Sequence, residues 1–115
     1  MLRPTVEMAR WPELSVVAGE AVAAALGAGA EVSHPNDVMI GGRKVAGVLP
    51  EATAGRVVLG VGVNVNQRAV ELPADAVKPP TSLFAELGRE LERAPLLAAI
   101  LFELEHRYDA WSGVS

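Results

Sequence analysis

The stretch that decides the fold is residues 34–47, which read HPNDVMIGGRKVAG. Runs of strand-forming residues lie on both sides of Gly41-Gly42, and a glycine pair accepts the positive φ angles of a tight hairpin turn. The pattern predicts antiparallel strands over residues 37–40 and 43–52. Such a hairpin would hold a carboxylate and an ammonium group near each other on a rigid sheet. This arrangement is suited to binding a small anionic reactant.

Further strands are predicted on both sides of this hairpin. Residues 30–33 precede it, and residues 56–65 follow after a short turn at Gly55. The apolar residues of 56–65 are nearly continuous, which predicts burial on both faces of that strand. Residues 1–4 are interpreted as the tail of another strand.

Three helices complete the predicted order of elements. Residues 12–26 carry apolar side chains at three- and four-residue spacing, with Pro12 at the first helical position. A short helix is expected from Thr81 or Ser82 to Leu87, and a long one over residues 95–111. The connection 67–80 is Pro-rich and long, which is typical of functional or mobile loops. The whole order predicts an α+β fold with an antiparallel sheet.

Composition limits the classes of function. The chain has 115 residues, enough for one domain, and 50% of them are apolar. Its net charge is −4 and it has no Lys/Arg run, which disfavours nucleic acid as a partner. It has no Cys and two His, so no protein-held metal site is predicted. Neither a membrane span nor a signal peptide is read from the sequence, so we expect a cytoplasmic protein.

Lys44 and Asp37 are the candidate catalytic residues. Regular alternation along a strand would put Lys44 on one face with Ala46 and Val48, where it could bind an anion. The alternative is an edge-strand lysine that discourages aggregation. Asp37 would lie across the hairpin from Lys44, where the two could flank a reacting carbonyl. The alternative for Asn36-Asp37 is an Asx turn that opens the strand.

Gly60 and Gly62 lie two residues apart in a predicted strand, so they share a face and leave a bare strip of sheet. Glycines inside a strand often mark the close approach of a ligand or of another backbone, and a helix packed on the strip is the alternative. The segment lacks the third glycine and following helix of a dinucleotide-binding fingerprint. Asn64 and Asn66 would point to the same face, to bind a ligand or to cap the strand end.

Taken together, these motifs resemble the central and C-terminal part of the catalytic domain of biotin protein ligases. The resemblance covers almost the whole chain, and its specific part is the order and spacing of Pro-Asn-Asp and Gly-Arg-Lys-x-Ala-Gly. It implies a mostly antiparallel mixed sheet flanked by helices, of the biotin/lipoate protein ligase type that is similar to class II aminoacyl-tRNA synthetases. Residues 1–115 would form a partial catalytic domain. The matching segments are Pro35-Asn36-Asp37, Gly42-Arg43-Lys44-Val45-Ala46-Gly47, Glu51, Gly60-Val61-Gly62-Val63-Asn64-Val65-Asn66 and Thr81-Ser82-Leu83.

The resemblance also implies an activity. The family joins biotin to AMP using ATP and Mg²⁺, and then passes the biotinyl group to a lysine of a biotin carboxyl carrier domain. By this resemblance, Lys44 would contact the biotin carboxylate and the adenylate phosphate, and Asp37 would lie near the carrier lysine. The implied substrate- and nucleotide-binding residues are Asn36, Arg43, Gly47, Gly60, Gly62 and Asn64.

The sequence departs from the family pattern in three ways. The Gly-rich, Arg-containing loop that folds over biotinyl-AMP is missing, so we expect the chain alone to be weakly active or inactive. Ser33-His34 stands where the family usually has Lys-Trp, which removes a positive charge and a stacking surface. Pro50 lies within a predicted strand, so the strand should be at an edge or bulged there. Family members often dimerise edge to edge, and we expect that a homodimer could form in the same way.

Two alternative functions stay open from the sequence. A lipoate–protein ligase or lipoyl transferase would share the fold and the Gly-Arg-Lys-x-Ala-Gly motif, although Pro-Asn-Asp fits the biotin group better. A non-catalytic binding remnant of the family is favoured by Ser33-His34 and by the missing loop.

Overall fold

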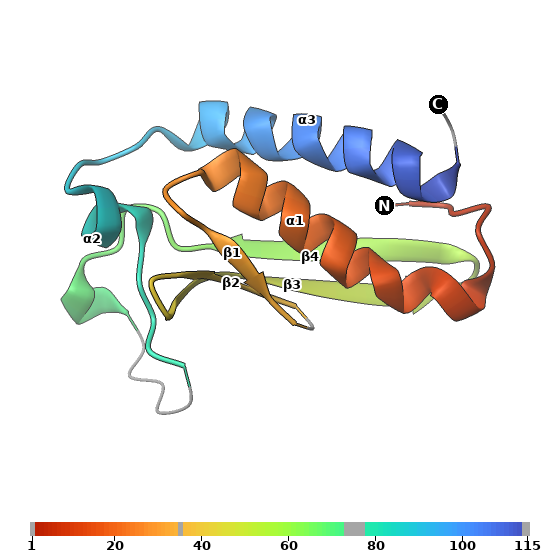
Figure 1. Cartoon of the computed structure of the whole chain (residues 1–115), viewed down its shortest axis with the longest axis horizontal. Coiled ribbons are helices and arrows are strands. Elements are labelled where there is room, and N and C mark those ends of the chain that lie inside the picture. The colour runs from red at the N-terminus through yellow and green to blue at the C-terminus, as the bar shows by residue number, and fades with distance from the viewer. Residues whose placement is uncertain (1, 35, 73–77, 114–115) are drawn as a thin grey trace.

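A four-stranded antiparallel sheet carries two long helices on one of its faces (Figure 1). The computed structural model describes residues 2–34, 36–72 and 78–113. The strands follow one another in the sheet in sequence order, and they are β1 (Glu31–Ser33), β2 (Asp37–Ile40), β3 (Arg43–Thr53) and β4 (Arg56–Val63). The helices are η1 (Met8–Glu13), α1 (Leu14–Leu26), η2 (Ala69–Glu71), α2 (Leu83–Leu87) and α3 (Arg93–Ser112). The predicted α+β fold with an antiparallel sheet is confirmed.

The two hairpin turns lie at the predicted glycines. Gly41 and Gly42 take φ angles of 56° and 79° between β2 and β3. Ala54 and Gly55 take φ angles of 47° and 76° between β3 and β4. Positive φ costs little for Gly41, Gly42 and Gly55, although it is unfavourable for Ala54, and the two turns fix the register of the strands that they join.

A β-bulge in β3 overturns one prediction about the faces of the sheet. Val38 pairs with Ala46 and Met39 pairs with Lys44, which leaves Val45 as an extra residue on β3. Val45 and Ala46 are both buried on the helix side of the sheet. Lys44 therefore does not share a face with Ala46, because the bulge breaks the regular alternation of side chains.

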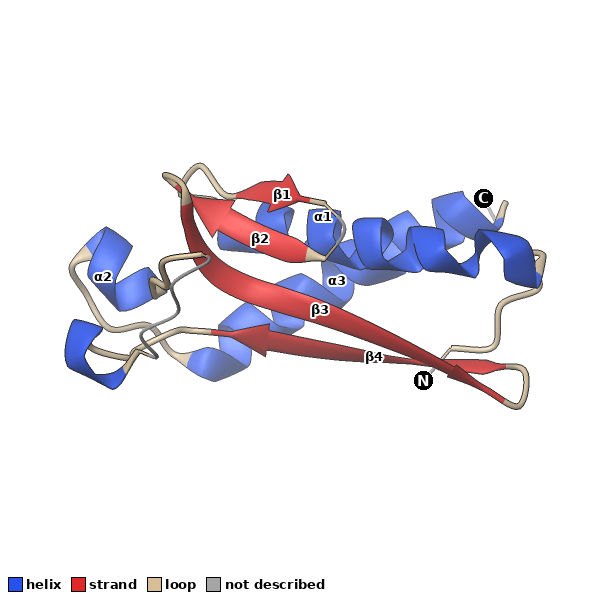
Figure 2. Ribbon diagram, turned by 90° about the horizontal axis from the view of Figure 1, so that it is seen from below, coloured by secondary structure: helices blue, strands red, loops and turns tan. Residues whose placement is uncertain are grey.

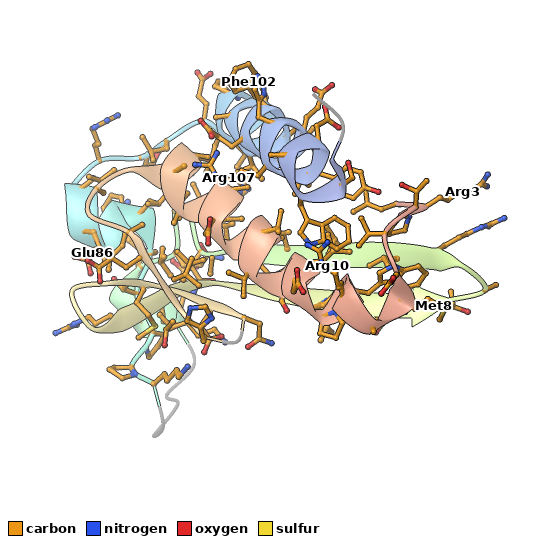
Figure 3. The ribbon with its side chains drawn as sticks, turned by 45° about the vertical axis from the view of Figure 1, so that its right-hand side comes forward. Arg3, Met8, Arg10, Glu86, Phe102 and Arg107 are labelled. Atoms are coloured by element: carbon orange, nitrogen blue, oxygen red, sulfur yellow. The ribbon has the colours of Figure 1, made fainter. Side chains whose placement is uncertain are left out.

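Helices α1 and α3 lie side by side and cover the sheet from the same side (Figure 1). The main core cluster joins Ala18 and Val22 of α1 to sheet residues such as Val38 and Val45, and Ile100 of α3 belongs to it. Figure 2 shows the strands in front of both long helices, so the opposite face of the sheet is the uncovered one. Phe102 lies on the outer side of α3 (Figure 3) and is 58% exposed.

Strand β4 is more exposed than predicted. Val57 is its only buried residue, and Val58 and Val61 are 40% and 37% exposed. The prediction of burial on both faces is wrong, because within the described residues β4 forms the edge of the sheet. The expected strand tail at residues 1–4 is reduced to one antiparallel bridge, in which Leu2 and Val57 exchange two backbone hydrogen bonds of 2.7 Å. Met1 lies outside the described residues.

The bridge between Leu2 and Val57 also explains how Pro50 fits within β3. Val57 uses its backbone groups toward Leu2, so its pair with Ala52 is a non-hydrogen-bonded one. Hydrogen-bonded and non-hydrogen-bonded pairs alternate in an antiparallel ladder, which makes Pro50 and Leu59 a non-hydrogen-bonded pair too. The N–H that Pro50 lacks would have been on the side of β3 away from β4. The pairing with β2 has already ended there, so β3 is an edge at Pro50, as predicted.

The helix boundaries differ slightly from the predicted ones. Pro12 lies inside the 3₁₀ helix η1, and the α-helix begins two residues later, at Leu14. The predicted cap of α2 is confirmed, because the Ser82 side chain accepts a hydrogen bond from the Ala85 N–H at 3.1 Å. Helix α3 extends slightly beyond the predicted 95–111 at both ends. In the described part of the chain, no helix has the length and apolar character to cross a membrane.

Candidate functional site

One carboxylate and two ammonium groups meet on the uncovered face of the sheet. Asp37 opens β2 and is 8% exposed. Its Oδ1 accepts a hydrogen bond from the Nζ of Lys44 at 3.1 Å, and its Oδ2 accepts one from the Nζ of Lys78. Burial raises the pKa of Asp37, but the hydrogen bonds from Lys78 and Lys44 outweigh it and hold the pKa below its usual value. Asp37 is therefore ionised at neutral pH, and the cluster carries a net charge of about +1.

The bulge and a glycine together place the Lys44 side chain. Asp37 pairs with Gly47 across the β2–β3 ladder, so both face the uncovered side, as Lys44 does. A Cβ atom at Gly47 would lie 3.4 Å from the Cε and 3.5 Å from the Nζ of Lys44. The absent side chain thus lets Lys44 lie close along its own strand and reach Asp37.

Backbone hydrogen bonds fix the segment that carries Lys78. The Lys44 N–H donates to the carbonyl oxygen of Pro79, and the Thr81 N–H donates to the carbonyl oxygen of Lys44, both at 2.8 Å. These bonds form a parallel bridge between Lys44 and Pro80. Sequence reasoning missed Lys78, which lies 41 residues from Asp37 in the chain. The available signal was that Lys78 belongs to the long connection 67–80, which is typical of functional or mobile loops, and lies just before Pro79-Pro80.

Two neighbouring hollows open beside this cluster. We name the first the Lys78 hollow, of about 410 Å³, and its lining includes Lys44, Gly47, Gly62, Asn64, Lys78 and Pro80. We name the second the Asn36 hollow, of about 440 Å³, and its lining includes Asn36, Asp37, Lys44, Gly47, Gly60 and Gly62. All of the predicted site residues except Arg43 line one or both hollows. Arg43 is exposed beside the hairpin turn and lines neither of them.

The glycines of β4 form the bare strip of sheet that the sequence predicted. This strip, which we call the glycine floor, lines the two hollows. Gly62 pairs with Gly47, and a Cβ atom at Gly62 would meet no other atom within 4 Å. A Cβ atom at Gly60 would meet the carbonyl oxygen of Leu49 at 3.4 Å. Of the two interpretations of this strip, the described residues support an open surface, because α1 and α3 cover the other face of the sheet (Figure 2).

The two asparagines after β4 have structural hydrogen bonds. The Nδ2 of Asn64 donates to the carbonyl oxygen of Thr81 at 3.1 Å, and Asn64 also lines the Lys78 hollow. The side chain of Asn66 makes two bonds of 2.9 Å with the backbone of Leu91 and so holds the segment before α3. Instead of the predicted ligand contact or strand-end cap, the Asn66 side chain binds the backbone of Leu91.

A third hollow is apolar and separate from the charged cluster. It has about 440 Å³ and lies between β4 and α3, where its lining includes Leu59, Val61, Leu97 and Leu101. We call it the β4–α3 groove. Leu97 and Leu101 are 57% and 55% exposed. Among the described residues, no group of three or more His, Cys, Asp or Glu side chains could hold a metal ion.

Comparisons with known proteins identify relatives of this chain. No protein-family model matches the sequence. The chain is 34% identical over 117 residues to the bifunctional ligase/repressor BirA of Bacillus spizizenii, a match that covers 94% of this chain and 36% of that protein. It is 38% identical over 114 residues to the biotin–[acetyl-CoA-carboxylase] ligase of Mycobacterium tuberculosis, where 92% of this chain and 41% of that protein are covered.

A solved structure shows the same fold. The biotin protein ligase of Aquifex aeolicus in complex with biotin and ATP matches with a TM-score of 0.80 and 29% identity, over 91% of this chain and 46% of that chain. The chain thus spans less than half of the length of each of these proteins. Sequence and fold together show that the chain belongs to the biotin protein ligase family, as a part of its members' length.

Proposed function

We propose that this chain forms the anion-binding part of a biotin–protein ligase. The enzyme would activate biotin with ATP to biotinyl-AMP and transfer the biotinyl group to a lysine of a biotin carboxyl carrier domain. The observation that carries the proposal is the ion pair of Asp37 and Lys44 beside Gly47 and the glycine floor. The family membership and the Aquifex aeolicus complex with biotin and ATP support the choice of ligands.

The first step would use Lys44. An oxygen of the biotin carboxylate attacks the α-phosphorus of ATP, a P–O bond forms, and the bond to the departing pyrophosphate breaks. Negative charge gathers on the phosphate oxygens between these two events. The ammonium of Lys44, which lines both hollows, would stabilise that charge. Asn36 and Asn64 would contact the nucleotide, and Gly47, Gly60 and Gly62 would leave room for the rings of biotin and adenine.

The second step would use Asp37. The carrier lysine must lose a proton before its nitrogen attacks the acyl carbon, whereupon the bond to AMP breaks. An ionised carboxylate beside that nitrogen helps the proton to leave, and the lowered pKa of Asp37 keeps it ionised. The described residues do not fit a protein-held Mg²⁺, because Asp37 is occupied by two lysines. We therefore expect Mg²⁺ to arrive with the phosphates of ATP.

The proposal extends to the activity of residues 1–115 alone, to their oligomeric state and to their location. We expect residues 1–115 alone to be weakly active or inactive, because they span 36% of the length of the BirA relative. The β4–α3 groove is lined by exposed leucines. Two copies could cover such apolar surface by pairing at the edge of β4, and we propose a homodimer of this kind. The proposed reaction uses ATP and an intracellular carrier, so the proposed location is the cytoplasm.

Calorimetric titration with a non-hydrolysable biotinyl-AMP analogue tests the function. We expect wild type to bind, and Lys44→Ala to bind at least about tenfold more weakly, because a charge-assisted hydrogen bond is lost. The matched control is Arg89→Gln, which removes an exposed cation that lines neither hollow. No binding by wild type, or equal binding by Lys44→Ala, would contradict the proposal. Tighter binding of a lipoyl-AMP analogue would favour the lipoate alternative instead.

A further inference from the structure

Both lysines of the chain meet at the same carboxylate. The sequence has ten Lys and Arg residues, of which Lys44 and Lys78 are the two lysines. Their ammonium groups bind the two different oxygens of Asp37. They come from separate segments, β3 and the connection before α2, and the backbone bond from Lys44 to Pro79 holds these segments together. The second lysine is therefore an integral part of the cluster.

The charge balance of the cluster points to an anionic ligand. Among the described residues, one ammonium group is enough to neutralise Asp37, so the second leaves one positive charge in excess. An ammonium group has three donors, and each lysine uses one of them on Asp37. The side chains of Lys44 and Lys78 are 40% and 32% exposed, and both line the Lys78 hollow. Their remaining donors can thus reach an anion in that hollow.

The segment before β2 offers no comparable cation. Ser33 ends β1 and is uncharged, and the exposed His34 follows it. Within the described residues, the second ammonium group at Asp37 comes instead from another part of the chain, at Lys78.

We propose that Lys78 is the second cation of the site, and that Lys44 and Lys78 hold the anionic phosphate linkage of an acyl-adenylate between them in the Lys78 hollow. The proposal rests on the proposed function and deepens it, because it assigns the charge of the bound linkage to a residue outside the motifs of the family. Lys78 acts on the ligand as a fixed positive charge.

A pair of ligands separates this role from a structural one. We would titrate wild type, Lys78→Gln and Lys78→Arg with two non-hydrolysable biotinyl-AMP analogues, one with an anionic phosphodiester linkage and one with an uncharged linkage of the same length. Lys78→Gln should weaken the anionic analogue about three- to tenfold, more strongly at low salt, as expected for a partly exposed charge. It should leave the uncharged analogue within about twofold, and Lys78→Arg should restore most of the binding of the anionic analogue. Arg89→Gln, an exposed cation outside the hollow, is the matched control for net charge.

Each outcome has a distinct meaning. An equal loss for both analogues in Lys78→Gln would assign Lys78 a structural role and overturn the inference, as would no loss for either analogue. Wild type that binds neither analogue would overturn the proposed function together with the inference. Wild type that binds both analogues, with no effect of Lys78→Gln, would leave the proposed function standing and reject only the role of Lys78.

Discussion

Asp37→Asn is the substitution that tests the charged cluster most directly. The variant keeps the shape of the side chain but removes the charge that holds Lys44 and Lys78. Two ammonium groups then face each other across a neutral amide. We expect the variant to fold with lower stability, because one carboxylate oxygen becomes an amide NH₂ group that cannot accept a hydrogen bond, the other bond loses its anionic acceptor, and the like charges repel.

The size of the effect follows from the exposure of the three side chains. Asp37 has a side-chain exposure of 11%, whereas those of Lys44 and Lys78 are 40% and 32%, so solvent screens both pairs. Each pair is then worth about 0.5–1 kcal/mol, and the substitution should cost about 1–2 kcal/mol. A chain of 115 residues has an unfolding entropy of about 0.24 kcal/mol/K, so the melting temperature should fall by about 4–8 °C.

Thermal unfolding followed by circular dichroism, as a function of pH, gives the decisive readout. The folded-state pKa of Asp37 lies below the unfolded one, so its contribution is fully present above about pH 4 and is lost as pH falls through the folded value. The difference between wild type and variant should therefore shrink in acid, whereas the control Glu105→Gln, on an exposed part of α3, should show little change at any pH. An undiminished difference at pH 2, or no difference at pH 7, would refute the assignment of these ion pairs.

Three further substitutions test the core, the cap and the floor of the site. Leu14→Ala should cost about 3 kcal/mol in urea denaturation because Leu14 is fully buried, and a cost below about 1 kcal/mol would contradict its place in the core. Ser82→Ala should cost about 1–2 kcal/mol in the same assay, since Ser82 accepts from the Ala85 N–H and donates to a carbonyl, whereas an unchanged midpoint would reject the cap. Gly62→Leu should weaken the biotinyl-AMP analogue more than about tenfold by filling the open floor, with a melting temperature that stays within about 3 °C of wild type. Full binding by Gly62→Leu would place the ligand elsewhere.

The parts of the fold that the sequence predicted depend on local signals. Gly41-Gly42 and Gly55 determine the two turns, and each turn sets which residues face each other on the adjoining strands. The approach of Asp37 and Lys44 could be predicted for this reason, since the hairpin between them is short. The cap at Ser82 is similarly local, because the bond it makes lies within four residues of the chain.

The parts that the sequence could not predict depend on contacts between distant segments. The bulge at Val45 arises where β3 pairs with β2 on one side and β4 on the other, and alternation alone cannot show it. The exposure of β4 depends on which elements cover it, and its apolar composition gave the wrong answer. Lys78 reaches Asp37 through the bridge between Lys44 and Pro80, a long-range pairing that no spacing in the sequence announces.

The gathering of both lysines at Asp37 has a practical consequence for anyone who labels this protein. The side-chain amines that residues 1–115 offer to amine-reactive dyes, cross-linkers and coupling resins are those of Lys44 and Lys78. Both lysines lie in the proposed binding surface, so a reagent that acylates either of them would modify that surface itself. A bound ligand should protect the two lysine amines from acetylation. Mass spectrometry of a lightly acetylated sample would therefore report what fraction of the site is occupied.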